Sequence, residues 1–199
     1  MSAKNSHTTA DYIEWEKAIN VVHRLFKEGK EGDIRMSAYV ACGIFMGLRV
    51  SDLRQLRWNI LLGEQTIEIK EKKTGKTRII KLNPDFQKHI RDCYQALKIQ
   101  NSNELCFLSQ KKTVYSTQRL NIKLKEINKK YRLGVKNMSN HSLRKAFGRR
   151  IFDMASETSK ELCLIKLGQC FNHSDVSITK RYLGLKTKEI LECYDLLTF

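Results

Sequence analysis

The sequence lacks any run of eighteen consecutive apolar residues, and its N-terminus lacks the apolar core of a signal peptide. A membrane-spanning helix needs about 20 apolar residues, so neither a membrane helix nor an export signal is predicted. Proline is nearly absent, and no repeat, linker or low-complexity segment divides the chain. We expect a flexible N-terminal segment, 1–10, followed by one compact cytoplasmic domain, 11–199.

No Cys-x-x-Cys pair occurs, and the six cysteines fall at irregular spacings. Zinc sites and disulfide frameworks both use recurrent spacings, so neither is indicated, and no metal or cofactor is predicted. A reduced cysteine packs like a small apolar residue. We therefore expect most of these thiols to be reduced and buried: Cys42, Cys93, Cys106, Cys163, Cys170 and Cys193.

Acidic residues are scarce where basic residues gather. The formal net charge is +16, and residues 110–150 hold eight lysines and five arginines against Glu126 alone, a net charge of +12. A soluble basic surface would account for such a run, but a polyanion is the expected partner, because each neutralised phosphate releases bound counterions. The concentration of charge beside His141 and Arg144 favours a nucleic-acid-binding face.

Apolar periodicity predicts a mostly helical chain. Gly29, Gly32 and Asp33 are expected to separate the first two helices, and Asn83 is expected to cap a helix that Pro84 opens. A helix from His141 carries a stripe of four apolar residues predicted to be buried: Leu143, Phe147, Ile151 and Met154. The other predicted helices span 12–26, 34–46, 117–131 and 156–167.

Two alternating segments, 65–70 and 78–82, predict a β-hairpin whose turn is supplied by Gly75 and whose tip is cationic. The apolar segment Leu105 to Leu108 is a candidate third strand. The predicted fold class is therefore α+β, mostly α, with a small antiparallel β-sheet.

A sharp corner is predicted between two helices. Gly47 suits the C-cap of the first helix, and Ser51 is a candidate N-cap of the second. Arg49 then lies on the corner, where its side chain either points outward for chemistry or bonds the last carbonyls of the first helix. The corner itself favours neither interpretation.

The residue types available are those needed to attack a phosphodiester. A tyrosine can act as nucleophile and hold a covalent intermediate, while cations stabilise the charge that gathers on the phosphate oxygens. His141 and Arg144 are three apart and so share a helix face, although a histidine beside a core stripe is more often structural. His173 and Tyr182 are nine apart, so helical periodicity places them on no common face.

Four motifs follow one another in a characteristic order: Gly47-Leu-Arg49-Val-Ser-Asp-Leu, Lys73-Thr-Gly-Lys, His141-Ser-Leu-Arg144 and Asn172-His173-Ser, with Tyr182 nine residues after His173. Together they resemble the signature set of the tyrosine recombinases, the phage integrase family, from about residue 10 to the end. That family commonly shows Leu-Gly-His before its second histidine. Here Leu167-Gly168-Gln169 comes earlier, and the register to Tyr182 assigns that place to His173.

The resemblance implies a catalytic domain that cuts one DNA strand at a time without metal or nucleotide. Tyr182 is expected to attack the scissile phosphate and form a 3′-phosphotyrosine, while Arg49 and Arg144 clamp its non-bridging oxygens. His141 is expected to accept a proton from the tyrosine or to hold the tyrosine in line, and His173 to donate to a phosphate oxygen. Lys73 is expected to protonate the departing 5′ oxygen, although Lys72 and Lys76 flank the same turn.

The resemblance further implies double-stranded DNA as partner, a homo-oligomer, expected as a tetramer on DNA, and a bacterial, nucleoid-associated location. The family's core-binding domain is not represented, so the chain is either a natural single-domain recombinase resembling short invertases or a fragment of a longer integrase. The apolar-faced segment from Lys188 to Phe199 is expected to dock on a neighbouring protomer, with packing on its own domain as the alternative, and it contains a decoy tyrosine, Tyr194.

Three functions are open: an integrase or invertase of a mobile element, a type IB topoisomerase-like enzyme with the same covalent chemistry, and a non-catalytic or truncated DNA-binding module.

Overall fold

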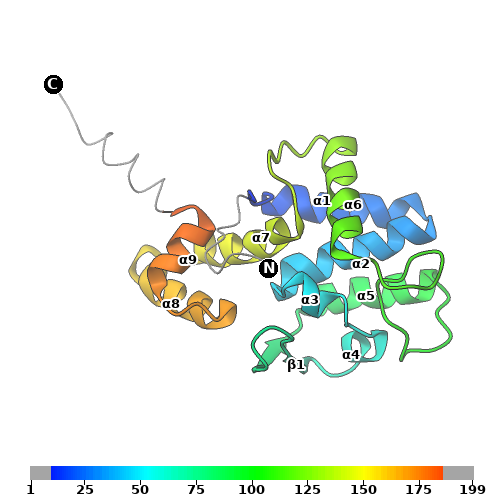
Figure 1. Cartoon of the computed structure of the whole chain (residues 1–199), viewed down its shortest axis with the longest axis horizontal. Coiled ribbons are helices and arrows are strands. Elements are labelled where there is room, and N and C mark those ends of the chain that lie inside the picture. The colour runs from blue at the N-terminus through cyan, green and yellow to red at the C-terminus, as the bar shows by residue number, and fades with distance from the viewer. Residues whose placement is uncertain (1–9, 186–199) are drawn as a thin grey trace. The chain divides into compact units, whose positions relative to one another are not determined.

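The computed structural model of the protein describes residues 10–185 (Figure 1). They fall into two compact units, a larger one of residues 10–147 and a smaller one of residues 148–185. Within these residues no helix is both long and apolar enough to cross a membrane.

The larger unit is mainly helical. Helix α7 (Asn140–Met154) begins in it and ends in the smaller unit. The other helices of the larger unit are α1 (Trp15–Glu28), α2 (Glu31–Met46), α3 (Val50–Leu53), α4 (Trp58–Leu62), α5 (Pro84–Ala96) and α6 (Thr117–Lys130).

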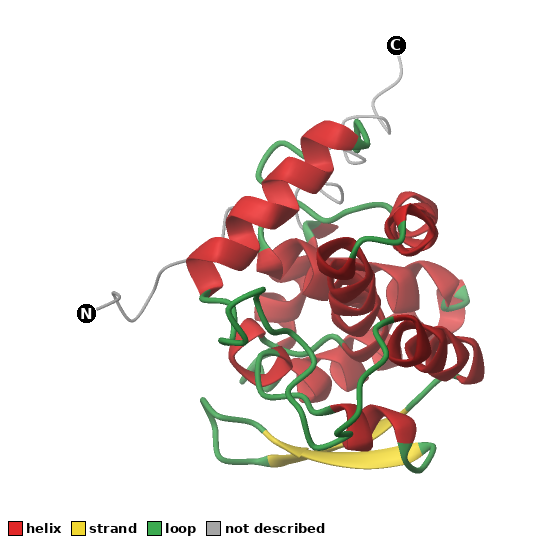
Figure 2. Cartoon of the chain, turned by 90° about the vertical axis from the view of Figure 1, so that its right-hand side faces the viewer, coloured by secondary structure: helices red, strands yellow, loops and turns green. Residues whose placement is uncertain are grey.

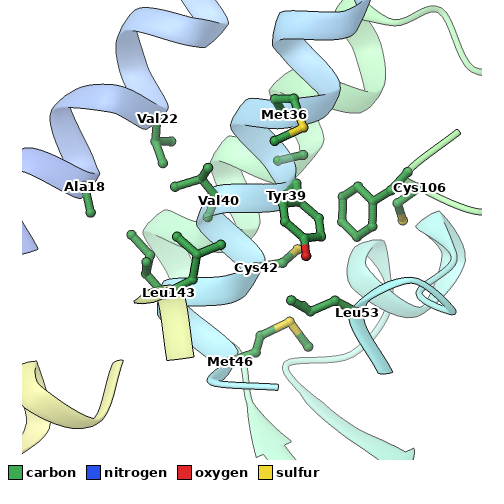
Figure 3. Packing of buried hydrophobic residues seen from close by; sticks show 14 of the residues in the cluster. Ala18, Val22, Met36, Tyr39, Val40, Cys42, Met46, Leu53, Cys106 and Leu143 are labelled. Carbon is green, nitrogen blue, oxygen red and sulfur yellow. The ribbon is translucent and has the colours of Figure 1, made fainter. Parts of the chain in front are cut away.

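Helix α2 is the centre of the larger unit. Its side chains are buried on nearly all sides, as expected of a helix that is surrounded by protein, and α1 and α5 both pack against it. Figure 3 shows side chains of α1, α2 and α7, together with Leu53 and Cys106, converging on one core. At its centre the ring of Tyr39 meets Phe107 edge-on, with ring centroids 4.9 Å apart.

The predicted hairpin is confirmed. Strands β1 (Thr66–Lys70) and β2 (Thr77–Lys81) pair antiparallel, with Ile67 opposite Ile80, and form a curved ribbon at one edge of the larger unit (Figure 2). The predicted third strand is wrong. Leu105 and Leu108 each make an isolated bridge, to Arg57 and Val114, so the described sheet has two strands.

The helix ends test the local predictions. Gly47 ends α2 with a left-handed φ of 56°, and Asn83 caps α5 by accepting from the backbone N–H groups of Asp85 and Phe86, both as expected. Gly29 ends α1 as predicted. Gly32 and Asp33 were also predicted to separate the two helices, but both lie inside α2, which begins at Glu31.

The thiols behave mostly as predicted. Burial raises the pKa of the Cys93 thiol to about 12, which suits a packed side chain rather than a nucleophile. Cys170 is half-buried, and Cys193 lies outside the described residues. Four cysteines are free and buried: Cys42, Cys93, Cys106 and Cys163.

The smaller unit contains the second half of α7, a 3₁₀ turn (Glu157–Ser159), α8 (Lys160–Phe171) and α9 (Val176–Leu183). The helix predicted over 156–167 therefore begins later and ends later than expected. The predicted buried stripe of α7 is wrong in this half, since Ile151 is 39% exposed and Met154 is 70% exposed. Gly148 lets α7 approach Phe171 and Leu183, because a Cβ there would lie 2.8 Å from either side chain.

Replacement of Gly47 by alanine is expected to destabilise the larger unit by about 2 to 4 kcal/mol. The left-handed backbone opposes any Cβ, and a Cβ at this position would lie 2.4 Å from Cδ1 of Phe147. Urea denaturation followed by circular dichroism measures the loss.

Two alanine substitutions separate these causes. Gly134 has a φ of 75° with nothing near its Cβ position, and Gly32 lies inside α2 with nothing near it either. Gly134→Ala should cost about 1 to 2 kcal/mol and Gly32→Ala should be neutral or stabilising. If Gly47→Ala and Gly134→Ala lose the same free energy of unfolding, the ring of Phe147 moves aside without cost, contrary to the expectation.

Candidate active site

The corner between α2 and α3 carries the first residue of the candidate site. Arg49 is the N-cap residue of α3, with an extended backbone, so its predicted place on the corner is confirmed. The predicted Ser51 cap is wrong. Ser51 lies inside α3, and its hydroxyl donates to the carboxylate of Asp52.

The last carbonyls of α2 are bound by two other arginines. Arg144 donates to the carbonyl of Gly47 at 2.6 Å, and Arg78 donates to the carbonyls of Met46 at 2.8 Å and Gly47 at 3.3 Å. Cations at a helix C-terminus are favoured by the helix dipole. Arg49 donates from Nη1 to Glu71 at 2.6 Å. Arg78 and Arg144 thus bind the carbonyls that were one alternative partner for Arg49.

Three contacts tie the hairpin to this corner. Besides the ion pair of Arg49 with Glu71, the backbone N–H of Lys72 donates to Oδ1 of Asp52 at 2.9 Å, and Arg78 of β2 reaches the end of α2. The turn at 71–76 is thereby held beside Arg49. Lys73 lies exposed on this turn, as do the two neighbouring lysines, Lys72 and Lys76.

The start of α7 is anchored by one buried amide. Asn140 accepts a hydrogen bond from the hydroxyl of Tyr39 on α2, and both its backbone N–H and its side-chain amide donate to Asn121 on α6. Because Asn140 directly precedes His141, these bonds fix the first turn of α7. Arg144 is one turn further on and is 4% exposed.

Electrostatics connect the four predicted residues of the larger unit. His141 is exposed, yet its pKa is lowered. The largest cause is desolvation by the surrounding protein. The second is the positive charge of four neighbours: Arg144, Lys145, Arg49 and Lys73. Positive neighbours disfavour the imidazolium form. A neutral imidazole at neutral pH is suited to accept a proton.

The smaller unit brings His173 and Tyr182 together, which periodicity had not predicted. Asn172 ends α8 in the left-handed conformation, and the backbone N–H of His173 then bonds the carbonyl of Gly168. The rings of His173 and Tyr182 meet edge-on with centroids 5.5 Å apart, and Phe171 packs against both. Nδ1 of His173 lies 3.0 Å from the hydroxyl of Thr179 on α9, so α9 fixes both the tyrosine and the histidine ring.

The predicted residues thus form two groups. Arg49, Lys73, His141 and Arg144 gather in the larger unit, and His173 pairs with Tyr182 in the smaller one. No group of three or more metal-binding side chains is arranged to hold an ion within residues 10–185. Tyr194 and the segment from Lys188 lie outside the described residues.

Part of the basic charge of residues 110–150 serves the fold. Arg144 is buried, Lys130 forms an ion pair with Glu28, and Lys123 lies over the ring of Tyr115. Three exposed cations on α6 remain available to a polyanion: Arg119, Lys125 and Lys129.

Comparison with known proteins decides the family. The model of the Phage integrase family matches residues 17–189, most of the chain. The chain belongs to the phage integrase family. Its members are the tyrosine-type site-specific DNA recombinases, and the sequence resemblance that predicted this class is confirmed.

Relatives of this phage integrase family chain agree with that placement. It is 29% identical over 145 residues to the Bacillus subtilis (strain 168) protein named "Probable integrase/recombinase YoeC", covering 72% of this chain and 74% of that protein. This relation supports the class at the level of sequence.

Solved structures confirm the predicted fold. XerA recombinase has a TM-score of 0.68 at 21% identity, covering 98% of this chain and 68% of the other. A post-cleavage complex of XerH recombinase with its difH substrate has a TM-score of 0.68 at 17% identity, covering 95% and 54%. A lambda integrase dimer bound to a COC′ core site has a TM-score of 0.62 at 14% identity, covering 94% and 51%. The chain spans about half the length of the XerH and lambda integrase chains.

Sequence motifs missed two residues of the candidate site. Glu71 and Arg78 bind the α2–α3 corner, but neither belongs to a motif that the sequence singled out. A usable signal was present at Glu71, an acidic residue inside a lysine-rich turn. An acidic side chain in such surroundings is expected to pair with a nearby cation.

Proposed function

We propose that the chain cuts and rejoins DNA through a covalent 3′-phosphotyrosine intermediate, as the integrase or invertase of a mobile element. The observation that supports this most directly is the gathering of Arg49, Lys73, His141 and Arg144 around the end of α2. Three cations and one histidine with a lowered pKa provide charge stabilisation and proton acceptance at one place.

Tyr182 is the proposed nucleophile. Its phenolic oxygen attacks the scissile phosphorus, the bond from phosphorus to the 5′ oxygen breaks, and the phosphate remains joined to the tyrosine. The phenolic proton passes to His141, and Lys73 gives a proton to the departing 5′ oxygen. Because the phosphodiester is exchanged rather than hydrolysed, a 5′ hydroxyl from another strand can reverse the step and complete strand exchange.

The two arginines and His173 bind the phosphate in this proposal. A guanidinium donates two parallel hydrogen bonds to neighbouring oxygens, which suits Arg49 and Arg144 to the non-bridging positions. His173, oriented by Thr179, donates to a phosphate oxygen. Exposed cations of α6 contact the DNA backbone, and strand exchange takes place in a homo-oligomer, expected as a tetramer on two duplexes.

Covalent trapping in EDTA tests the proposal. Purified protein is incubated with nicked duplexes taken from the DNA that flanks its gene, and the products are separated on a denaturing gel beside a native binding gel. The expected result is a protein–DNA adduct at the 3′ end of the cut strand. Recombinant duplexes should follow when a second site is supplied.

The other outcomes are informative. Binding without an adduct would identify a DNA-binding module and contradict the proposal. An adduct with processive relaxation of supercoiled DNA and no recombinants would identify a topoisomerase-like enzyme.

A further inference from the structure

Glu71 is a fully buried carboxylate at the end of β1, and the phosphate chemistry proposed above gives it no role. Its side chain is 0% exposed, and its Oε2 accepts from Nη1 of Arg49 at 2.6 Å. A buried carboxylate is costly unless it is paired and hydrogen-bonded, and short bonds from guanidinium to carboxylate are among the strongest available. The pairing with Arg49 therefore fixes the orientation of both side chains.

The same carboxylate oxygen also closes the turn of the hairpin. The hydroxyl of Thr74 donates to Oε2 of Glu71 at 3.0 Å, and the backbone N–H of Gly75 donates to the carbonyl of Glu71 at 2.8 Å. Lys73 lies between Glu71 and Thr74 in sequence and is exposed. Without these bonds the turn would have many accessible conformations, and a lysine on it would seldom occupy one position.

We propose that Glu71 is a positioning residue for strand cleavage, joining the turn that carries Lys73 to the guanidinium of Arg49 through one carboxylate oxygen. Lys73, the general acid, and Arg49, which binds the phosphate, are then held in a fixed position relative to each other. This inference rests on the proposed function, because Lys73 and Arg49 have those roles only in that reaction.

The rest of the hairpin does not depend on Glu71. Strands β1 and β2 pair through five residue pairs, and the backbone N–H of Lys72 is held by Asp52. A substitution at Glu71 should therefore loosen the turn without unfolding the larger unit. Thermal melting of each variant verifies this before any rate is compared.

Three variants and two substrates test the proposal. Glu71→Met removes the side-chain bonds to Arg49 and Thr74 at similar length, Glu71→Gln keeps an acceptor oxygen, and Glu68→Met is the control, since Glu68 is exposed on the same strand. One substrate has the ordinary scissile phosphate. The other has sulfur in place of the 5′ bridging oxygen, and a thiolate leaves without needing a proton because a thiol is far more acidic than an alcohol.

On the oxygen substrate, Glu71→Met should slow single-turnover cleavage by about 10- to 100-fold, because a small displacement of a catalytic group costs about that much. Glu68→Met should stay within about threefold of the unsubstituted protein, because Glu68 is exposed. Glu71→Gln should fall between the two variants, because it keeps an acceptor oxygen but loses the charge that pairs with Arg49. On the sulfur substrate, Lys73→Ala should return to nearly the unsubstituted rate, because the missing proton is no longer required. Glu71→Met should recover only part of its lost rate, because Arg49 also loses its partner in that variant.

Two results would overturn the proposal. Normal cleavage by Glu71→Met on the oxygen substrate would remove any positioning role, and equal slowing on both substrates would place the effect away from Lys73. Limited trypsin digestion gives a readout that needs no activity: cleavage after Lys72, Lys73 or Lys76 should be faster in Glu71→Met than in Glu68→Met. Equal digestion would overturn the proposal, whereas faster digestion in a protein that never cuts DNA would refute the proposed function alone.

Discussion

Tyr182→Phe should abolish the covalent adduct, lowering it by at least about 10⁴-fold, while DNA binding stays within about twofold. Phenylalanine lacks the oxygen that would attack phosphorus but keeps the ring. That ring packs edge-on against His173 and Phe171, with centroids 5.5 and 5.3 Å away, and these contacts survive the substitution. The melting temperature should therefore change little, and the denaturing gel with the native gel measures both effects.

Two further tyrosines serve as controls for Tyr182→Phe. Tyr94 packs on Trp58 in the larger unit with ring centroids 5.7 Å apart, so Tyr94→Phe makes the same chemical change away from the site and should leave the adduct intact. Tyr194→Phe tests the second candidate nucleophile in the sequence. An adduct that survives in Tyr182→Phe and disappears in Tyr194→Phe would move the nucleophile to the C-terminal segment.

Local sequence signals predicted most of the secondary structure correctly. The strongest were those in which two physical causes agreed, such as Asn83 with Pro84 at the start of α5, where a side-chain cap precedes a residue with a preset φ. The hairpin combined alternating burial with a glycine turn. In each case the deciding interactions lie within a few residues of one another.

The errors arose where tertiary packing outweighed a local preference. A glycine inside a helix destabilises it by about 1 kcal/mol relative to alanine. At Gly32 the burial of many α2 side chains stabilises the helix by more than this. Leu105 and Leu108 pair with two different segments, at Arg57 and at Val114, so each makes an isolated bridge and no continuous strand forms. The apolar stripe of α7 extended in sequence beyond the core that covers its first half.

The site was predictable as a set of residues but not as an arrangement. Motif order identified the candidate residues, since each motif is short and local. The contacts that hold them are distant in sequence: Arg49 with Glu71, Lys72 with Asp52, and Arg144 with Gly47. No periodicity connects residues so far apart. For this reason Glu71 and Arg78 became visible only in the folded chain.

Arg144→Ala should reduce single-turnover cleavage by at least about 10²- to 10³-fold, because a preorganised donor to the developing charge is lost. Binding of DNA should change little, since Arg144 is 4% exposed and adds little to the surface that the DNA backbone meets. Arg144→Lys should recover part of the rate, because it restores the charge without the planar fork.

Arg144 also has a structural contact, and Arg78 provides the matched control for it. Both arginines donate to the carbonyl of Gly47 at the end of α2, so either substitution leaves that carbonyl with the other donor. Each should cost about 1 to 3 kcal/mol of stability, measured by urea denaturation, as expected for a hydrogen bond from a charged group. If both variants lose similar stability and cleavage fails only in Arg144→Ala, the loss of rate belongs to phosphate stabilisation. If Arg78→Ala slows cleavage as severely, the end of α2 rather than the guanidinium of Arg144 controls the reaction, and the proposed clamp is wrong.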